Sequence, residues 1–272
     1  MGGDFMPSTY AHNKFGKLVI AKLSGDTKDI IRKFPDSFRI GLQGPDFLFF
    51  YRAFYINKIN QTGVKHHRQD VYDFMEHAVS VIKKYGKNSP EYSYILGFIC
   101  HFTLDCNCHP YVNKFMEITG CGHVEIEGDL EHLMISKDNY IPQYYPMDYL
   151  IPANRETALS MVSFYENLSP KIILESLKWM KFLKRFFVAP GFFKRHLIDT
   201  CFHMTMNYKK LNGHVIKPGI NKKCRQQTKF LYKVLSNSVK NAVFLINDFN
   251  NAVERDTSLS NEFHKDFNGN PY

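Results

Sequence analysis

Residues able to bind a metal ion are concentrated in the stretch Tyr94–Tyr111. It begins as a nearly continuous apolar run, typical of a buried helix, and carries His101, Asp105 and His109 at successive spacings of four. Residues four apart share one face of a helix, so we expect His101 and Asp105 to converge on one ion. Pro110 disfavours helical geometry at the preceding residue, so we expect His109 to leave the helix and serve a neighbouring ion. A lone histidine in an apolar helix is usually a core residue, but burying imidazole and carboxylate together is costly unless they are paired or coordinated.

A second pair of candidate ligands follows the break at Gly120-Cys-Gly122. We predict a helix that begins at His123, and this helix places Glu127 four residues later on the same face. His132, nine residues beyond His123, falls away from that alignment and is expected to be a surface residue.

Three further candidates lie upstream. His12 falls in the first turn of a helix predicted from about Ser8 to Ala21, and Asp46 ends a turn-rich loop that begins at Gly41. His66 and His67 are adjacent and precede a predicted amphipathic helix over 68–85. On that helix His77 lies beside the apolar stripe and is expected to be structural or exposed.

Together the candidates suit a cluster of metal ions. Imidazole and carboxylate groups favour zinc, with iron or manganese as alternatives. Eight ligands exceed one tetrahedral ion, so two or three ions are expected. Cys106 and Cys108 are weaker candidates, because no second cysteine pair stands at zinc-finger spacing; we expect all six cysteines to be reduced thiols.

The elements that must position these ligands are helices. No convincing alternation of apolar and polar residues predicts a strand, and the second half of the chain predicts helices over 154–168, 171–187, 192–211 and 226–256. We therefore predict an all-α protein with a single multi-helix domain, 1–272, built around a di- or trinuclear metal cluster. Its parts would be a metal-ligand core (7–135), a helical C-terminal layer (154–256) and a loose polar tail (257–272).

Composition limits the class of protein and its partners. The chain has 272 residues, is 44% hydrophobic and contains 24 Phe and 16 Tyr, which is ample for a core. It has no apolar run long enough to span a membrane and no secretory signal at residues 1–6, so a cytoplasmic protein is expected. The net charge of +9 favours anionic partners, whether phosphate esters, nucleic acid or an acidic membrane surface.

Two aromatic segments leave alternatives open. In residues 180–195, large apolar and basic residues alternate around Pro190-Gly191. That pattern is found in segments that contact anionic bilayers, so peripheral membrane contact is one interpretation. The interpretation we favour is that two amphipathic helices meet at this turn and bury their phenylalanines. The run Phe47–Tyr51, with Tyr55, would stack on bases, enclose a quaternary ammonium headgroup, or pack in the core.

Five motifs occur together in a recognisable order: Pro7-Ser-Thr-Tyr-Ala-His12, Gln43-Gly-Pro-Asp46, Gly63-Val-Lys-His-His67, His101-x-x-x-Asp105-x-x-x-His109 and His123-x-x-x-Glu127. In that order the chain resembles the zinc-dependent phospholipase C family, over roughly residues 7–135. The family is similar in fold to the fungal single-strand-specific nucleases, and the likeness is closest to its leaderless, intracellular-type members.

The resemblance implies three sites. Asp46, His67, His101 and Asp105 would hold one zinc ion, and His109, His123 and Glu127 a second. Asp105 would bridge to a third ion that His12 also binds. His67 is preferred to His66 because it stands at the usual distance before the Phe74-Met75 pair. In secreted relatives an N-terminal tryptophan completes the third site, whereas the one tryptophan here is Trp179.

The implied activity is hydrolysis of a phospholipid headgroup ester by a zinc-bound hydroxide. Asp46 would be a ligand only, or would also orient or deprotonate the attacking water. The alternatives are a nuclease or small-molecule phosphodiesterase that uses the same cluster, and a helical metal-binding protein without turnover. The expected partner is a phospholipid or other phosphodiester substrate, and a stable nucleic-acid complex is not expected.

Overall fold

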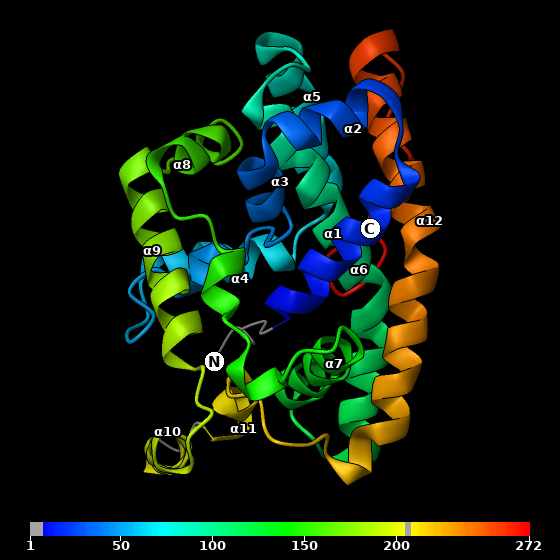
Figure 1. Cartoon of the computed structure of the whole chain (residues 1–272). Coiled ribbons are helices and arrows are strands. Elements are labelled where there is room, and N and C mark those ends of the chain that lie inside the picture. Colours follow the sequence, from blue (N-terminus) through cyan, green and yellow to red (C-terminus); the bar gives the residue numbers. More distant parts are fainter. Residues whose placement is uncertain (1–7, 205–207) are drawn as a thin grey trace.

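The computed structural model describes residues 8–204 and 208–272, and these residues form helices without a β-strand (Figure 1). An isolated bridge between Lys265 and Pro271 is the one β-type pairing recorded in this part of the chain. The all-α prediction is therefore confirmed. The α-helices of the first half are α1 (Thr9–Lys22), α2 (Gly25–Lys33), α3 (Pro35–Gly41), α4 (Lys58–His67), α5 (Val71–Tyr85), α6 (Pro90–Thr119) and α7 (His123–Lys137).

The central element is α6, which Figure 1 shows running through the middle of the molecule. The Ser89 side chain accepts a hydrogen bond from the Tyr92 backbone N–H at its start, and Gly120, with φ of 69°, ends it. Its first fifteen residues are almost all buried, as the apolar run predicts. Close approach of α3 depends on two glycines: a Cβ at Gly41 would lie 2.1 Å from the backbone oxygen of Tyr94, and one at Gly97 would lie 2.2 Å from that of Phe38.

The expectation that His109 leaves the helix at Pro110 is wrong. The helix α6 continues through Pro110 to Thr119, so His109 stays in register with Asp105. Pro110 has no N–H and so gives no bond to the carbonyl of Cys106, four residues back. The C-terminal segment packs against this turn: the Cys106 thiol donates a hydrogen bond to the carbonyl of Asp266 at 3.0 Å. Tertiary packing thus accommodates the proline inside a long helix.

His66 and His67 precede the helix α5, as predicted, but they also end a helix that was not predicted, α4. The helix α4 begins with Asn57 as its N-cap, whose side chain accepts from the N–H groups of Ile59 and Asn60, and runs to His67. Its weakly apolar sequence, with one fully buried residue (Gly63), explains why periodicity did not reveal it.

The second half of the chain adds helices around this core. They are α8 (Arg155–Val162), α9 (Pro170–Phe186), α10 (Phe192–Met204), α11 (Tyr208–Leu211) and α12 (Arg225–Arg255), and short 3-10 turns occur between them and before α8. In Figure 1, α12 packs along α6, and α8 and α9 lie on the opposite side. The helix predicted over 154–168 is shorter, and the one over 192–211 is represented by α10 and α11, with 205–207 outside the described residues. Pro7 also lies outside them.

The tail 257–272 was expected to be loose, and this is wrong. Leu259, Phe263 and Phe267 are buried, and the side chain of Asp266 accepts from the backbone N–H groups of Asn268 and Asn270. Three apolar residues spaced by four within a polar segment are enough to anchor it to the core.

Two expectations about chemistry and class can be checked against the fold. No helix among the described residues is long and apolar enough to cross a membrane. All six cysteines are free of disulfide bonds, and burial raises the pKa of the Cys108 thiol, which opposes its use as a thiolate ligand.

Candidate metal centre

The eight predicted ligands come from five elements and converge at one place in the fold. His12 lies in α1, Asp46 opens the 3-10 helix η1 (Asp46–Phe50), and His67 is the last residue of α4. The helix α6 supplies His101, Asp105 and His109, and α7 supplies His123 and Glu127. All except His67 are buried, and the His67 side chain is 12% exposed. Their potential ligand atoms form three groups whose members lie within 4.8 Å of one another.

The first group is Asp46, His67 and His101. His67 Nδ1 lies 2.9 Å from the carbonyl of Gly63; because a carbonyl only accepts, Nδ1 is the donor. His67 Nε2 is then directed at Asp46 Oδ1, 2.8 Å away. His101 is oriented in the same way, since its Nδ1 donates to the carbonyl of Leu42 at 3.2 Å, and its Nε2 lies 3.9 Å from Asp46 Oδ1.

The second group is His12, His101 and Asp105, which shares His101 with the first. Asp105 lies between the two histidines: its Oδ1 is 3.2 Å from His12 Nε2, and its Oδ2 is 3.3 Å from His101 Nε2. The two imidazole rings stack with centroids 4.3 Å apart.

The third group is His109, His123 and Glu127. His109 Nδ1 donates to the carbonyl of Phe267 at 2.7 Å, so its Nε2 is directed at Glu127 Oε1, 3.5 Å away. His123 Nε2 lies 3.2 Å from the same oxygen. His109 Nε2 is also 3.9 Å from Asp105 Oδ1, so the third group borders the second.

The residues present fit metal ions. Several buried atoms of the candidate ligands have no hydrogen-bond partner among the described residues: both ring nitrogens of His12, Nε2 of His101 and of His109, Oδ2 of Asp105 and Oε2 of Glu127. Leaving buried polar atoms unsatisfied is costly. Lone pairs of neutral imidazoles that face carboxylates in a dry site are the donor set that zinc prefers, and the Nδ1 bonds to backbone carbonyls are the outer contacts that orient metal-binding histidines.

The cluster is strongly coupled electrostatically. Burial raises the pKa of Asp105 and of Glu127, but the neighbouring histidines outweigh it: the pKa of Asp105 falls below its usual range and that of Glu127 falls to about 2. Burial lowers the pKa of His101 to about 4, so this ring is neutral near pH 7 and its Nε2 is available as a ligand. In His12 and His67, the attraction of Asp105 and Asp46 respectively exceeds the effect of burial and raises the pKa.

The loop before Asp46 is shaped to receive His101. Gly44 has φ of +48°, and a Cβ at this position would lie 2.1 Å from Cδ2 of the His101 ring. A side chain here would both strain the backbone and displace a candidate ligand. The glycine of the motif around Asp46 is therefore required by its close approach to His101.

The structure brings together residues that sequence reasoning missed. The tail places Phe267 against the rings of His67 and His101, with centroids 4.8 and 5.5 Å away. From α9, Lys184 is buried close enough to Glu131, Asp46 and Glu127 for their charges to act on its pKa, which burial lowers. Glu131 is itself buried, and burial raises its pKa to about 7. Neither residue has a strong signal in the sequence, because Lys184 is one of several lysines in α9 and Glu131 is one of several acidic residues in α7.

The other histidines and the aromatic run lie apart from the three groups. His66 contacts the rings of Phe74 and Tyr165, and burial lowers its pKa to about 4, whereas His67 reaches Asp46. His77 and His132 face the backbone carbonyls of Ser163 and Lys217. Residues 47–50 are buried in the core, which leaves from that segment only the half-buried Tyr51 and the exposed Tyr55.

Comparison with known proteins now identifies the family. The model of the family described as zinc dependent phospholipase C matches residues 11–187, more than half of the chain. The chain belongs to the zinc-dependent phospholipase C family. All eight candidate ligands fall inside the matched region, whereas the tail that contacts His109 lies outside it. No curated protein and no solved structure matches the chain. Family membership and the His/Asp/Glu groups together support a metal-dependent phosphodiesterase.

Proposed function

We propose that this member of the zinc-dependent phospholipase C family hydrolyses the headgroup phosphodiester of a phospholipid, and that the eight residues of the three groups hold two or three zinc ions. The observation that carries the proposal is the set of buried ring nitrogens and carboxylate oxygens without hydrogen-bond partners among the described residues, in three groups of which two share His101. Zinc bound there would neutralise phosphate oxygens and supply a water of lowered pKa.

The chain's own residues would divide the remaining work. Asp46 has a carboxylate oxygen near both His67 and His101, so it would be a ligand that also accepts a proton from the attacking water. Buried Lys184 would add positive charge on the α9 side of the site, next to Glu131. The carbonyls of Gly63, Leu42 and Phe267 would keep three histidines in the tautomer with a free Nε2.

Lipid is preferred to nucleic acid as the substrate because the matched family is described as zinc dependent phospholipase C. The aromatic run 47–50 adds no support for a nuclease. A nuclease of this kind would use exposed aromatic side chains as stacking platforms. The phenylalanines of the run 47–50 are buried in the core and cannot serve in that way. The net charge of +9 attracts either substrate and does not discriminate between them.

The test is a side-by-side assay of the zinc-loaded full chain on phosphatidylcholine in mixed micelles, on a soluble aryl phosphocholine diester, and on single-stranded DNA. We expect the lipid and the aryl diester to be cleaved faster than DNA, with Asp105→Asn inactive on all three. Rapid DNA cleavage with inert lipid would replace the proposal with a nuclease, and inertness towards all three at full zinc occupancy would indicate a non-catalytic protein.

A further inference from the structure

One side of the molecule carries exposed aromatic side chains on three neighbouring segments. They are the outer face of α9, the connection between η1 and α4 (residues 51–57), and the first turns of α10, which Figure 1 shows along the same edge. The exposed residues are Phe54 (69%), Tyr55, Ile56, Phe182 (54%), Phe186, Phe192, Phe193 (88%) and Leu197. We call this set, with the half-buried Trp179, the aromatic face. The favoured sequence interpretation, in which the phenylalanines of 180–195 are buried, is wrong for four of them.

The aromatic face is continuous across the segments. Phe54 packs edge-on against Trp179 with ring centroids 5.6 Å apart, and Trp179 packs likewise against Phe182 at 5.9 Å. Phe182 stacks on Phe186 at 6.2 Å, and the ammonium of Lys194 lies 5.4 Å from the Phe186 ring. On α9, positions 179, 182 and 186 form one stripe by helical spacing, opposite the stripe of Ile173, Leu177, Met180 and Lys184 that faces the core.

Positive charge surrounds the aromatic face. Residues 170–199 contain seven Lys and Arg but only two acidic residues, Glu175 and Asp199. Glu175 is already paired with Arg52, at 3.0 Å. Among the basic residues, Lys178, Arg185 and Lys194 are exposed beside the aromatic stripe. Lys184 is the exception: it is buried and belongs to the metal centre, so it does not contribute to this surface.

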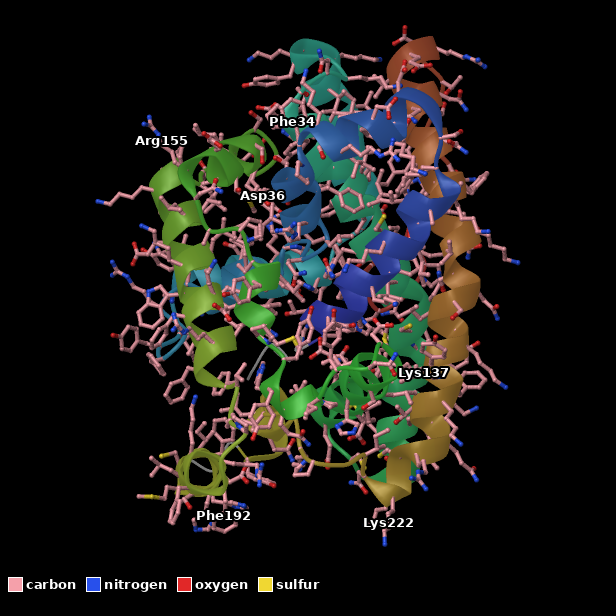
Figure 2. All side chains as sticks on the ribbon, viewed as in Figure 1. Phe34, Asp36, Lys137, Arg155, Phe192 and Lys222 are labelled. Atoms are coloured by element: carbon pink, nitrogen blue, oxygen red, sulfur yellow. The ribbon has the colours of Figure 1, made fainter. Side chains whose placement is uncertain are left out.

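The helix α10 has apolar residues on both its inner and its outer side. Its inner side buries Ile198 and Phe202 against Ala189 and Val215, whereas its outer side leaves Phe193 and Leu197 exposed. Phe192 lies at the outer edge of the molecule in Figure 2. A helix with apolar residues on a solvent-facing side costs free energy unless that side meets an apolar partner. Aromatic residues at the level of lipid headgroups, with Lys and Arg around them, are typical of proteins that bind an anionic membrane surface.

We propose that the aromatic face lies on an anionic phospholipid bilayer. Charge complementarity decides for this partner, since a second copy of the same surface would bring like charges together. The proposal extends the proposed function, because a headgroup hydrolase has to work at a bilayer. A small pocket lined by Lys184, Phe187 and Val188 and by Glu131 of α7 lies beside the end of α9.

The test uses the one tryptophan of the chain, Trp179, which lies within the aromatic face. Vesicles of phosphatidylcholine with and without phosphatidylglycerol are titrated into the zinc-loaded protein, and binding is followed by tryptophan emission. We expect a blue shift, quenching by lipids brominated in their acyl chains, and tighter binding to vesicles that contain phosphatidylglycerol. Binding that is weak on both vesicle types, or that leaves Trp179 unquenched, overturns the proposal.

Matched variants locate the contact. Phe193→Ser on α10 should weaken vesicle binding at least ten-fold, whereas Phe244→Ser, at an exposed phenylalanine of α12, should leave it unchanged. Lys178→Gln with Arg185→Gln should weaken vesicle binding about 25-fold at low salt, since each basic residue near an anionic bilayer contributes about five-fold. Lys229→Gln with Lys240→Gln on α12 should leave it unchanged. If the α12 control variants weakened vesicle binding as much as the α9 and α10 variants, the proposal would be overturned. A parent chain that is a dimer, and that Phe193→Ser converts to a monomer, would also overturn it.

Two further measurements distinguish failure of the membrane proposal from failure of the proposed function. Vesicle binding is measured again with Asp105→Asn, which should bind vesicles as the parent does, and turnover of the soluble aryl diester is measured with Phe193→Ser, which should be unchanged. Vesicle binding by a protein without turnover would remove the proposed function and keep the membrane surface. Turnover of the aryl diester without vesicle binding would do the reverse.

Discussion

His109 Nδ1 donates a hydrogen bond to the backbone carbonyl of Phe267 across 158 positions of sequence, at 2.7 Å. The bond fixes the tautomer of His109 and directs its Nε2 towards Glu127. Phe267 also packs against two other candidate ligands, so a segment outside the family match contacts three of the eight.

Phe267→Ala should therefore weaken zinc binding as well as the fold. Removing a fully buried aromatic side chain costs about 3–5 kcal/mol, and loss of contact with the ligand rings should lower zinc affinity about ten-fold or more. Phe263→Ala is the matched control, since this buried tail residue stacks on Phe102 rather than on a histidine. Chelator competition and thermal unfolding measure the two effects; equal zinc affinity in the two variants would contradict the positioning role.

Asp105→Asn should be the most damaging single ligand change. Its two oxygens face His12 and His101, so the substitution removes the one carboxylate of the second group, which shares His101 with the first. We expect at least one ion per chain to be lost, and turnover to fall by more than about 100-fold, beyond what outer contacts contribute. His132→Ala, which touches a backbone carbonyl instead of the cluster, should be silent. A silent Asp105→Asn with a harmful His132→Ala would refute the ligand assignment.

The adjacent histidines His66 and His67 should separate stability from metal binding. His67→Ala removes the group 2.8 Å from Asp46 and should reduce zinc content and activity. His66 packs against Phe74 and Tyr165, so His66→Ala should lower the melting temperature while zinc content stays unchanged. Zinc analysis and calorimetry on both variants give the answer, and the opposite pattern would assign the ligand to His66.

Asp138 should contribute an acid-dependent part of the stability that holds α1 beside α7. It accepts from Tyr10 Oη and pairs with Lys14 at 2.6 Å; burial raises its pKa, but these partners outweigh it and the pKa is lowered. Because folding lowers this pKa, the ionised carboxylate stabilises the fold at pH values above its unfolded pKa, near 4. This stabilisation is lost as the pH falls through the folded pKa. Asp138→Asn should cost about 1 kcal/mol at pH 7, with a smaller difference from the parent by pH 3. Chemical unfolding across pH 3–7 tests this; a constant difference would contradict it.

The parts of the fold and of the candidate site that could be predicted from the sequence are those whose signal is local in the chain. His101, Asp105, His123 and Glu127 were predictable because a spacing of four on a helix is a geometric statement, and the structure brings them together. His109 was assigned to the right group for the wrong reason, because packing of the tail keeps the helix intact through Pro110. Phe267 and Lys184 were missed because their roles arise from contacts between segments far apart in the chain. Helical spacing puts Lys184 on the apolar stripe of α9, but it does not reveal which acidic residues of other segments this lysine meets.

The central claim is that the three groups hold metal ions. The metal content of protein purified without chelator tests this claim most directly. Elemental analysis should find at least two transition-metal ions per chain, mainly zinc, and His101→Ala should reduce that number because His101 is shared by two groups. Less than one ion per chain that cannot be restored by added zinc would contradict the account.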